Sequence, residues 1–174
     1  MKKDITLIMY SHSSYSDVWP IFFKQSKLHL KKYKKVLFSD DDLGKLPNDW
    51  SFIKYDDSKN YAERMHSCLE QIETPLTFLH HEDMPLYKKP DHKLLDEYID
   101  IVKNEDIDFI RLLRSVDPLS FNYKNKKTLY PVPNHSRYLF ATQPSIFKTD
   151  KLTKIYGETQ INTIGDFEIY AQFV

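Results

Sequence analysis

Short apolar runs alternate along the chain with longer segments in which apolar residues recur every three or four positions. The runs are rich in branched and aromatic residues, a composition typical of buried β-strands. They predict strands at 5–10, 36–38, 52–55, 75–79, 108–113 and 138–142.

The segments between the runs have the spacing of amphipathic helices. The first helix is expected to begin at Ser16 or Asp17, either of which would cap it, with Pro20 tolerated in its first turn. Asp91 is the expected cap of a helix at 91–103. Further helices are expected at 60–72, 149–156 and 166–173.

Strands that alternate with helices over the first two thirds of the chain predict a three-layer α/β/α fold around a mostly parallel, Rossmann-like sheet. A length of 174 residues suggests a single domain, and the pattern shows no internal boundary. Because the last predicted helix runs to the final residues, a domain trimmed at its C-terminus is an alternative to a complete one.

Composition excludes several classes of function. The chain has 3 glycines and neither a GxGxxG nor a GxxxxGK[ST] motif, so it lacks a glycine-rich phosphate loop. Its 25 basic and 25 acidic residues balance, so no overall field attracts nucleic acid or an anionic membrane. The lysines at 31–35 are interpreted as solvated charge near a helix end, with weak contact to a membrane surface or an anionic acceptor as the alternative.

Cysteine usage and hydropathy indicate the compartment. Cys68 is the single cysteine, which excludes a disulfide framework, and its helical position suggests a core thiol. The N-terminal apolar segment is too short for a signal peptide, and no apolar run approaches the roughly 18 residues of a membrane-spanning helix. We therefore expect a cytoplasmic protein without stable membrane insertion, with peripheral membrane contact as an alternative.

Acidic side chains follow three successive predicted strands, at 40–42, 56–57 and 82–83, and a further pair, Asp166 and Glu168, lies on the last helix. Because the carboxyl ends of parallel strands meet at one edge of a sheet, we expect the first three clusters to lie together. Carboxylates there can bind a divalent cation that neutralises a diphosphate, or accept hydrogen bonds from a base or ribose. The alternative is that these are ordinary surface turns.

The segment Thr77-Phe-Leu-His-His-Glu-Asp-Met84 is the most informative of the chain, because an apolar run ends in four polar side chains. Adjacent strand residues point to opposite faces, so at most one of His80 and His81 shares a face with Asp83. A zinc site needs three convergent protein ligands, and no HExxH spacing is present. A metal-binding histidine and a structural one therefore both stay open.

Arg64 is expected on a helix face opposite the apolar residues and near the acidic strand ends. It would contact a phosphate or balance Glu63 and Asp57. A Ser/His/Asp hydrolase built around Ser11 and His12 is disfavoured, because the chain has no GxSxG elbow.

These residues together resemble a GT-A fold glycosyltransferase of the nucleotide-diphospho-sugar transferase superfamily. The resemblance rests on Tyr10-Ser-His-Ser and Phe38-Ser-Asp-Asp-Asp42 after two strands, the helix Tyr61-Ala-Glu-Arg-Met65, and Thr77-Phe-Leu-His-His-Glu-Asp83. Two later segments add to it: 138–147 resembles the strand and turn before a late helix, and Gly165-Asp-Phe-Glu168 is similar to the segment that opens it. The resemblance spans nearly all of 1–174, with the donor-binding half at about 1–90 and the acceptor half at about 91–174.

The resemblance implies a donor site with a metal. The aspartate after the second strand, Asp40 or Asp41, would recognise the nucleotide base. The Asp-x-Asp motif that holds the metal and diphosphate falls on His81-Glu82-Asp83. It implies Mn²⁺ or Mg²⁺ with Asp83 and His81 as ligands, and the histidine in place of the first aspartate leaves metal dependence open.

The resemblance also implies a general base. Glu168 or Asp166 matches the position of the carboxylate that deprotonates the acceptor hydroxyl in an inverting enzyme. The remaining substrate-binding residues that we expect are Tyr10, Ser11, Asp57, Arg64 and Glu82.

The predicted function is therefore that of a glycosyltransferase of polysaccharide biosynthesis. We expect it to bind no nucleic acid. It would move a hexose or deoxyhexose from a nucleoside-diphosphate sugar to a glycan or lipid-linked acceptor. The position of the base favours inversion, and retention stays open because no sequence feature reports stereochemistry. One alternative is an inactive carbohydrate- or protein-binding module of the same fold, which the His81 replacement favours. The other is a sugar nucleotidyltransferase, which would need a glycine-rich basic signature after the first strand.

Overall fold

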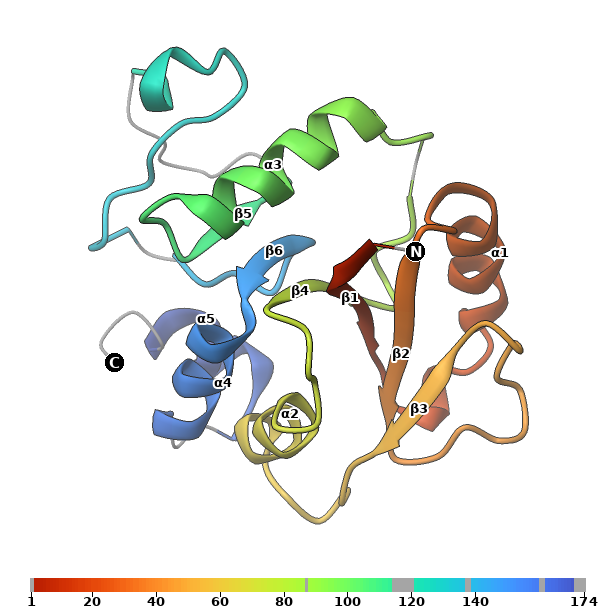
Figure 1. Ribbon diagram of the computed structural model, residues 1–174. Helices are drawn as coiled ribbons and strands as arrows, with labels where there is room; N and C mark the ends of the chain where they lie inside the picture. Colours follow the sequence, from red (N-terminus) through yellow and green to blue (C-terminus); the bar gives the residue numbers. More distant parts are fainter. Residues whose placement is uncertain (1, 87, 114–120, 137–138, 160–161, 171–174) are drawn as a thin grey trace.

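The computed structural model describes residues 2–86, 88–113, 121–136, 139–159 and 162–170. Its centre is one six-stranded sheet in the order β3-β2-β1-β4-β6-β5 (Figure 1). The strands are β1 (Lys2–Tyr10), β2 (Tyr33–Ser39), β3 (Ser51–Lys54), β4 (Leu76–His81), β5 (Phe109–Arg111) and β6 (Ser145–Lys148). β1 to β4 pair in parallel, whereas β6 runs antiparallel to β4 and β5. The mostly parallel sheet predicted from the sequence is confirmed.

Helices cover both faces of this sheet. In the described residues they are α1 (Trp19–His29), α2 (Tyr61–Leu69), α3 (His92–Asn104), α4 (Thr149–Glu158) and α5 (Ile164–Tyr170), with 3₁₀ turns η1 (Ser13–Tyr15) and η2 (Tyr123–Asn125). Figure 1 shows α2, α4 and α5 gathered together, away from α1 and α3. The three-layer prediction is thus confirmed. Searched over the same residues, the structure contains no helix of the length and apolarity needed to span a membrane.

The core divides into two clusters, one on each face of the sheet, because successive strand residues point to opposite sides. Leu7 and Met9 of β1 pack on the face covered by α1 and α3. Ile8 and Tyr10 of the same strand pack on the face covered by α2, α4 and α5. Both faces of this central strand are therefore buried, in agreement with its continuous apolar run.

The first helix begins later than the sequence suggested. Neither Ser16 nor Asp17 caps it: its first residue is Trp19, and Val18 at the cap position makes no side-chain hydrogen bond. The preceding residues instead form η1, which His12 caps by accepting a hydrogen bond from the Ser14 backbone N–H. Ser16 and Asp17 have the propensity to cap a helix. Ser16 instead ends η1, and α1 begins at Trp19.

The predicted strand at 138–142 is wrong over its described part, because 139–142 form a turn and irregular backbone. Tyr138 lies outside the described residues. The strand falls a few residues later, as β6, and Phe140 instead packs its ring against Phe109 at a centroid distance of 5.4 Å. The predicted helix at 166–173 is present as α5, and 171–173 lie outside the described residues.

Strand register brings the predicted site together. Tyr10, the last residue of β1, lies opposite Phe38 of β2 and His81 of β4. The polar residues that follow these three strands therefore leave the sheet side by side at its carboxyl edge, where open α/β sheets bind ligands.

Candidate functional site

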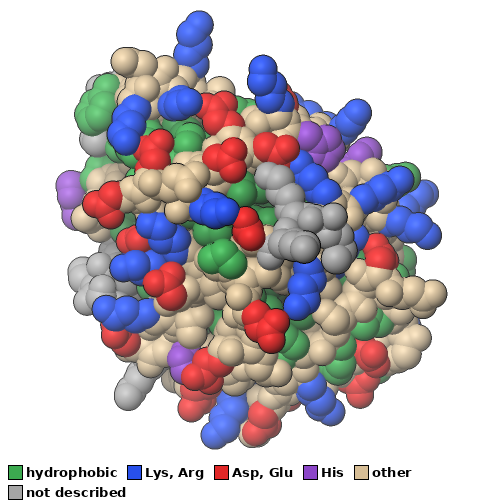
Figure 2. Space-filling model, in the orientation of Figure 1, with side chains coloured by type: hydrophobic (Ala, Val, Ile, Leu, Met, Phe, Trp, Pro, Cys, Tyr) green, Lys and Arg blue, Asp and Glu red, His purple; other side chains and the backbone are tan. Residues whose placement is uncertain are grey.

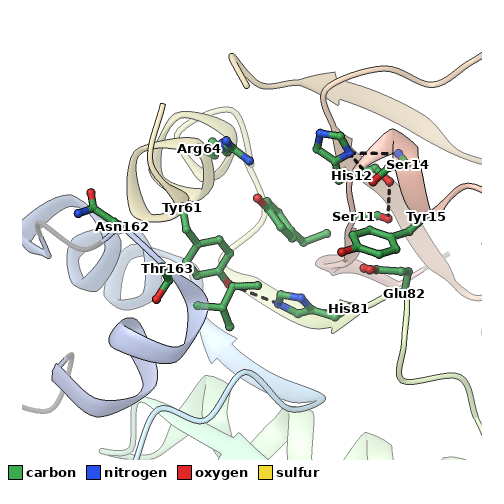
Figure 3. Close-up of a pocket in the computed structure, with 12 residues that line it drawn as sticks. Ser11, His12, Ser14, Tyr15, Tyr61, Arg64, His81, Glu82, Asn162 and Thr163 are labelled. Atoms are coloured by element: carbon green, nitrogen blue, oxygen red, sulfur yellow. Dashed lines mark hydrogen bonds between the residues drawn. The ribbon is translucent and has the colours of Figure 1, made fainter. Parts of the chain in front are cut away.

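A cavity of about 430 Å³ opens at the carboxyl edge of β1 and β4. This volume lies within the range of small-molecule sites in proteins. Figure 3 shows its lining, which comes from the β1–η1 loop, from α2, from the end of β4 and from the start of α5. The lining residues are Tyr10, Ser11, His12, Ser14, Tyr15, Tyr61, Arg64, His81, Glu82, Asn162, Thr163 and Ile164.

Arg64 supplies the positive charge at the cavity. Its guanidinium forms an ion pair with Asp57 at 2.9 Å and lies over the ring of Tyr55, 5.3 Å from the centroid. Its Nε donates to the Lys59 carbonyl at 2.7 Å, which fixes the direction of the side chain. Burial opposes the charge, but the hydroxyl of Tyr10 and the Asp57 carboxylate outweigh it and raise the pKa of Arg64. The ion pair with Asp57 is one of the two roles that the sequence suggested for Arg64, beside contact with a phosphate.

Glu82 supplies negative charge on the other side of the cavity. Figure 3 shows it at the end of β4 beneath Tyr15, across from Arg64 on α2. Burial, together with the neighbouring Asp83 charge, raises the pKa of Glu82, although a hydrogen bond from Ser11 and the proximity of His12 act against the shift. The carboxyl group is therefore closer to taking up a proton at neutral pH than an exposed glutamate.

Asp40 holds the loop after β1 in place. Its two carboxylate oxygens accept hydrogen bonds from the backbone N–H and the hydroxyl of Ser13, each at 2.6 Å. Burial acts in the other direction, yet these bonds and one from Ser39 lower the pKa of Asp40. His12 bridges the same region, with its Nε2 3.8 Å from Asp40 and 3.4 Å from Asp57. Asp40 thus shapes the cavity without lining it.

His81 belongs to a buried chain of polar groups. Its Nε2 lies 3.4 Å from the hydroxyl of Tyr61, which in turn lies 3.0 Å from the hydroxyl of Tyr156 (Figure 3 draws the first contact). Burial lowers the pKa of His81 to about 4, although Asp83 and Glu168 partly oppose this. The ring therefore stays neutral at physiological pH, and it lines the cavity although it is almost fully buried.

His80 points to the opposite face, as the strand alternation predicted. Its ring packs against Phe78 at 4.6 Å and against Phe22 of α1 at 5.3 Å. Of the two histidines, only His81 therefore faces the cavity.

The two predicted base candidates lie on α5. Glu168 accepts hydrogen bonds from the backbone N–H and the hydroxyl of Thr142, both at 2.7 Å, through one of its oxygens. Thr163 caps α5 by accepting a hydrogen bond from the Asp166 backbone N–H at 3.1 Å, and the Asp166 carboxylate accepts one from the Thr163 hydroxyl at 2.7 Å. Neither base candidate lines the cavity, but Glu168 is close enough to influence the pKa of both His81 and Tyr61.

The proposed metal ligands do not converge. Among the described residues, no group of three His, Cys, Asp or Glu side chains is arranged to hold a metal ion. Asp83 is exposed and does not line the cavity, and Asp41 is engaged in a turn, accepting from the Leu43 backbone N–H at 2.7 Å. His81 and Asp83 alone therefore do not form a cation site.

Sequence reasoning missed several lining residues. Asn162, Thr163 and Ile164 come from the far end of the chain, and no local pattern signalled them. Tyr15 was not singled out from the sequence, yet it is 56% exposed at the cavity. Its position after the first strand was the available signal.

The architecture is a GT-A-like α/β fold, similar to that of nucleotide-diphospho-sugar transferases. TarS from S. aureus shares it with a TM-score of 0.61 and 14% identity, over 97% of this chain and 55% of that structure. The bifunctional IspDF from Campylobacter jejuni shares it with a TM-score of 0.56 and 19% identity, over 95% of this chain and 47% of that structure. For 2-C-methyl-D-erythritol 4-phosphate cytidylyltransferase from Thermus thermophilus, the TM-score is 0.53 and the identity is 11%, over 95% of this chain and 83% of that structure.

This chain therefore spans about half the length of the TarS and IspDF structures. No protein-family model and no curated protein sequence matches it. At such low identity the likeness extends to the fold, and the chemistry has to be argued from the site itself.

Proposed function

We propose that the chain is a transferase that uses a nucleoside-diphosphate sugar and passes the sugar to a glycan or lipid-linked acceptor. The observation that carries the proposal is the placement of Arg64 and Glu82 on opposite walls of one cavity, at the carboxyl edge of the parallel strands. A guanidinium binds phosphate oxygens through two donors at once. A carboxylate on the opposite wall accepts hydrogen bonds from sugar hydroxyls.

Aromatic side chains around the β1–η1 loop suit a nucleobase. Tyr15 presents an exposed ring at the cavity, and bases stack on such rings with little dependence on their identity. Tyr10 lines the same wall but is stacked on Tyr55 at 5.4 Å, so it supports the loop. Because Ser13 occupies both oxygens of Asp40, we assign Asp40 to positioning this loop. Ser11 is buried and its hydroxyl accepts from the Trp19 indole N–H at 2.7 Å, so we assign it to supporting the same wall.

We also propose that a divalent cation binds together with the donor. Mg²⁺ is commonly held by one or two carboxylates together with substrate phosphates, without a complete protein cage. Glu82 and Asp83 are the carboxylates at the end of β4 that suit such binding, and a bound cation would neutralise diphosphate charge. The neutral His81, hydrogen-bonded to Tyr61, is assigned to orienting that wall.

The group transfer requires one base. The acceptor hydroxyl oxygen attacks the anomeric carbon, the bond from that carbon to the diphosphate oxygen breaks, and the nucleoside diphosphate leaves with the electron pair. The hydroxyl proton passes to a carboxylate. We assign this role to Glu168, whose second oxygen is not used by Thr142. We assign Asp166 to holding the hydroxyl of Thr163, the residue that caps α5.

Isothermal titration with UDP, GDP, CDP and dTDP, each with and without Mn²⁺, tests the donor site. We expect one nucleotide to bind and Arg64→Gln to weaken it by about 10- to 100-fold, because a hydrogen bond to a charged group contributes about 1.5–3 kcal/mol. Lys93→Gln, which removes an exposed charge from α3, is the matched control. Absence of binding by all four nucleotides would leave the non-catalytic binding module as the better interpretation.

A nucleotidyltransferase is the second candidate, because the chain spans 83% of the Thermus thermophilus cytidylyltransferase. Such an enzyme would bind CTP and release pyrophosphate in the presence of an alcohol phosphate. Release of pyrophosphate would replace our proposal, whereas release of a nucleoside diphosphate from a nucleotide sugar would support it.

A further inference from the structure

The outward face of α1 combines basic and apolar side chains. We define the α1 face by exposed residues that fall within about one third of the helix circumference at 3.6 residues per turn. They are Pro20, Ile21, Lys24, Lys27, Leu28 and, just beyond the helix, Lys31. The opposite side of the helix carries its buried residues, among them Trp19 and Phe22, so the α1 face is not needed by the core.

The charge of this region is one-sided, although the whole chain is neutral. From Val18 to Ser39 the sequence contains no aspartate or glutamate. Over the same stretch it carries six lysines: Lys24, Lys27, Lys31, Lys32, Lys34 and Lys35. Figure 2 shows blue side chains gathered at the edge of the molecule where α1 lies.

The lysines of the α1 face are available to a partner. Lys32 pairs with Asp96, and Lys35 is buried against Asp49 at 2.8 Å, so both serve the fold. Within the described part of the chain, no ion pair joins Lys24, Lys27 or Lys31 to an acid. All three are exposed to solvent, and Lys27 also adds at longer range to the effect of Lys35 in lowering the pKa of Asp49.

Apolar side chains stand among these lysines. Ile21 is 53% exposed and Leu28 is 57% exposed, and they lie about two helical turns apart on the same side. A polyanion such as nucleic acid or an acidic protein segment would use the lysines but leave these two side chains in water. A lipid surface takes both, because apolar side chains enter the acyl boundary while lysine amines stay at the headgroups.

We propose that the α1 face binds the surface of an anionic membrane. The complementarity is between the positive charge of the lysines and anionic headgroups, with Ile21 and Leu28 entering the interface. Surface binding does not depend on the proposed transferase activity. One consequence does rest on that function: Tyr15 lies at the cavity only a few residues before α1, so a docked helix would bring the cavity close to a membrane-bound acceptor.

Co-sedimentation with vesicles tests the proposal. The protein should bind vesicles of phosphatidylcholine mixed with phosphatidylglycerol, bind phosphatidylcholine alone far less, and be released by high salt. Replacing Lys24, Lys27 and Lys31 by Gln should weaken binding by about a hundredfold, at about fivefold per lysine near the surface. Absence of sedimentation with the anionic vesicles would overturn the proposal.

Two further variants give the test its specificity. The control replaces Lys127, Lys151 and Lys154 by Gln, which removes the same charge from other exposed positions and should leave binding unchanged. The double variant Ile21→Ser and Leu28→Ser should weaken binding by about tenfold, through lost apolar burial. Equal weakening by the control, or no effect of the serine pair, would each contradict a membrane-specific face.

Folding and donor binding are measured on every variant, by thermal unfolding and by nucleotide titration. All the substituted side chains are exposed and lie outside the cavity, so both should match the parent protein. Loss of vesicle binding with intact nucleotide binding would therefore separate this proposal from the proposed function.

Discussion

At the scale of single residues, His80 and His81 leave β4 toward opposite faces of the sheet and are both held neutral. Burial lowers the pKa of His80 to about 3 and that of His81 to about 4, from an ordinary value of 6.5. In the unfolded chain both imidazoles take up a proton below pH 6.5. The folded state excludes those protons, so acid favours unfolding.

We expect the free energy of unfolding to be largest above pH 6.5 and to fall as the pH drops toward the folded pKa values. Each histidine contributes a slope of up to about 1.4 kcal/mol per pH unit in that window. Urea unfolding between pH 7.5 and 4.5 measures this slope, and His80→Phe, which preserves a ring beside Phe22 and Phe78, should reduce it. The exposed His135→Gln controls for loss of an imidazole. An unchanged slope in His80→Phe would contradict the assignment.

At the scale of elements, α2 is the helix that carries the site, and a capping box fixes its start. The Asn60 side chain accepts from the Glu63 backbone N–H at 2.9 Å, and the Glu63 carboxylate accepts from the Asn60 backbone N–H at 3.1 Å. Tyr61 and Arg64 lie in the first turn that this box secures. The sequence predicted a helix start at this asparagine, and the structure confirms it.

We expect Asn60→Ala to lower the free energy of unfolding by about 1 kcal/mol, because it removes the side-chain acceptor of the Glu63 backbone N–H. Asn60→Asp retains an acceptor oxygen and should stay close to the parent protein. Chemical denaturation of the three proteins measures the difference. Equal stability of the alanine and aspartate variants would show that α2 is held by packing alone.

At the scale of the whole molecule, the end of the chain returns to complete the cavity. Phe167 of α5 stacks on Tyr156 at a centroid distance of 4.2 Å, and the Tyr61 backbone N–H reaches the Asn162 carbonyl at 3.5 Å. Glu168 ties the same helix to Thr142. One wall of the site therefore depends on contacts between residues far apart in the sequence.

We expect Glu168→Gln to lower the rate of sugar transfer by about 10²- to 10⁴-fold, the usual contribution of a general base. The amide oxygen can still accept from Thr142, so thermal stability should change little. Asp166→Asn serves as the control on the same helix. Transfer that survives in Glu168→Gln but not in Asp166→Asn would move the base to Asp166.

The hydrophobic pattern was sufficient for the parts of this protein that obey local rules. Short apolar runs predicted the strand that ends at Tyr10 and a strand at 75–79, which the structure extends to His81, and a period-3.6 repeat predicted the helix that carries Arg64. The rule that parallel strands end at one edge then placed Glu82 beside them. The pattern predicted a strand at 138–142, whereas β6 lies at Ser145–Lys148. A short apolar run does not show which adjacent segment of the chain will pair with the sheet.

Tertiary structure alone decided how the predicted groups are used. Asp40 was predicted to meet a base, but Ser13, 27 residues away, occupies both of its oxygens. Thr163 was not predicted at all, yet it lines the cavity. The sequence by itself determined the layers and the edge at which the site forms, because periodicity and strand direction are local properties. Which polar groups stay free there depends on hydrogen bonds between distant segments, and these exist only once the chain has folded.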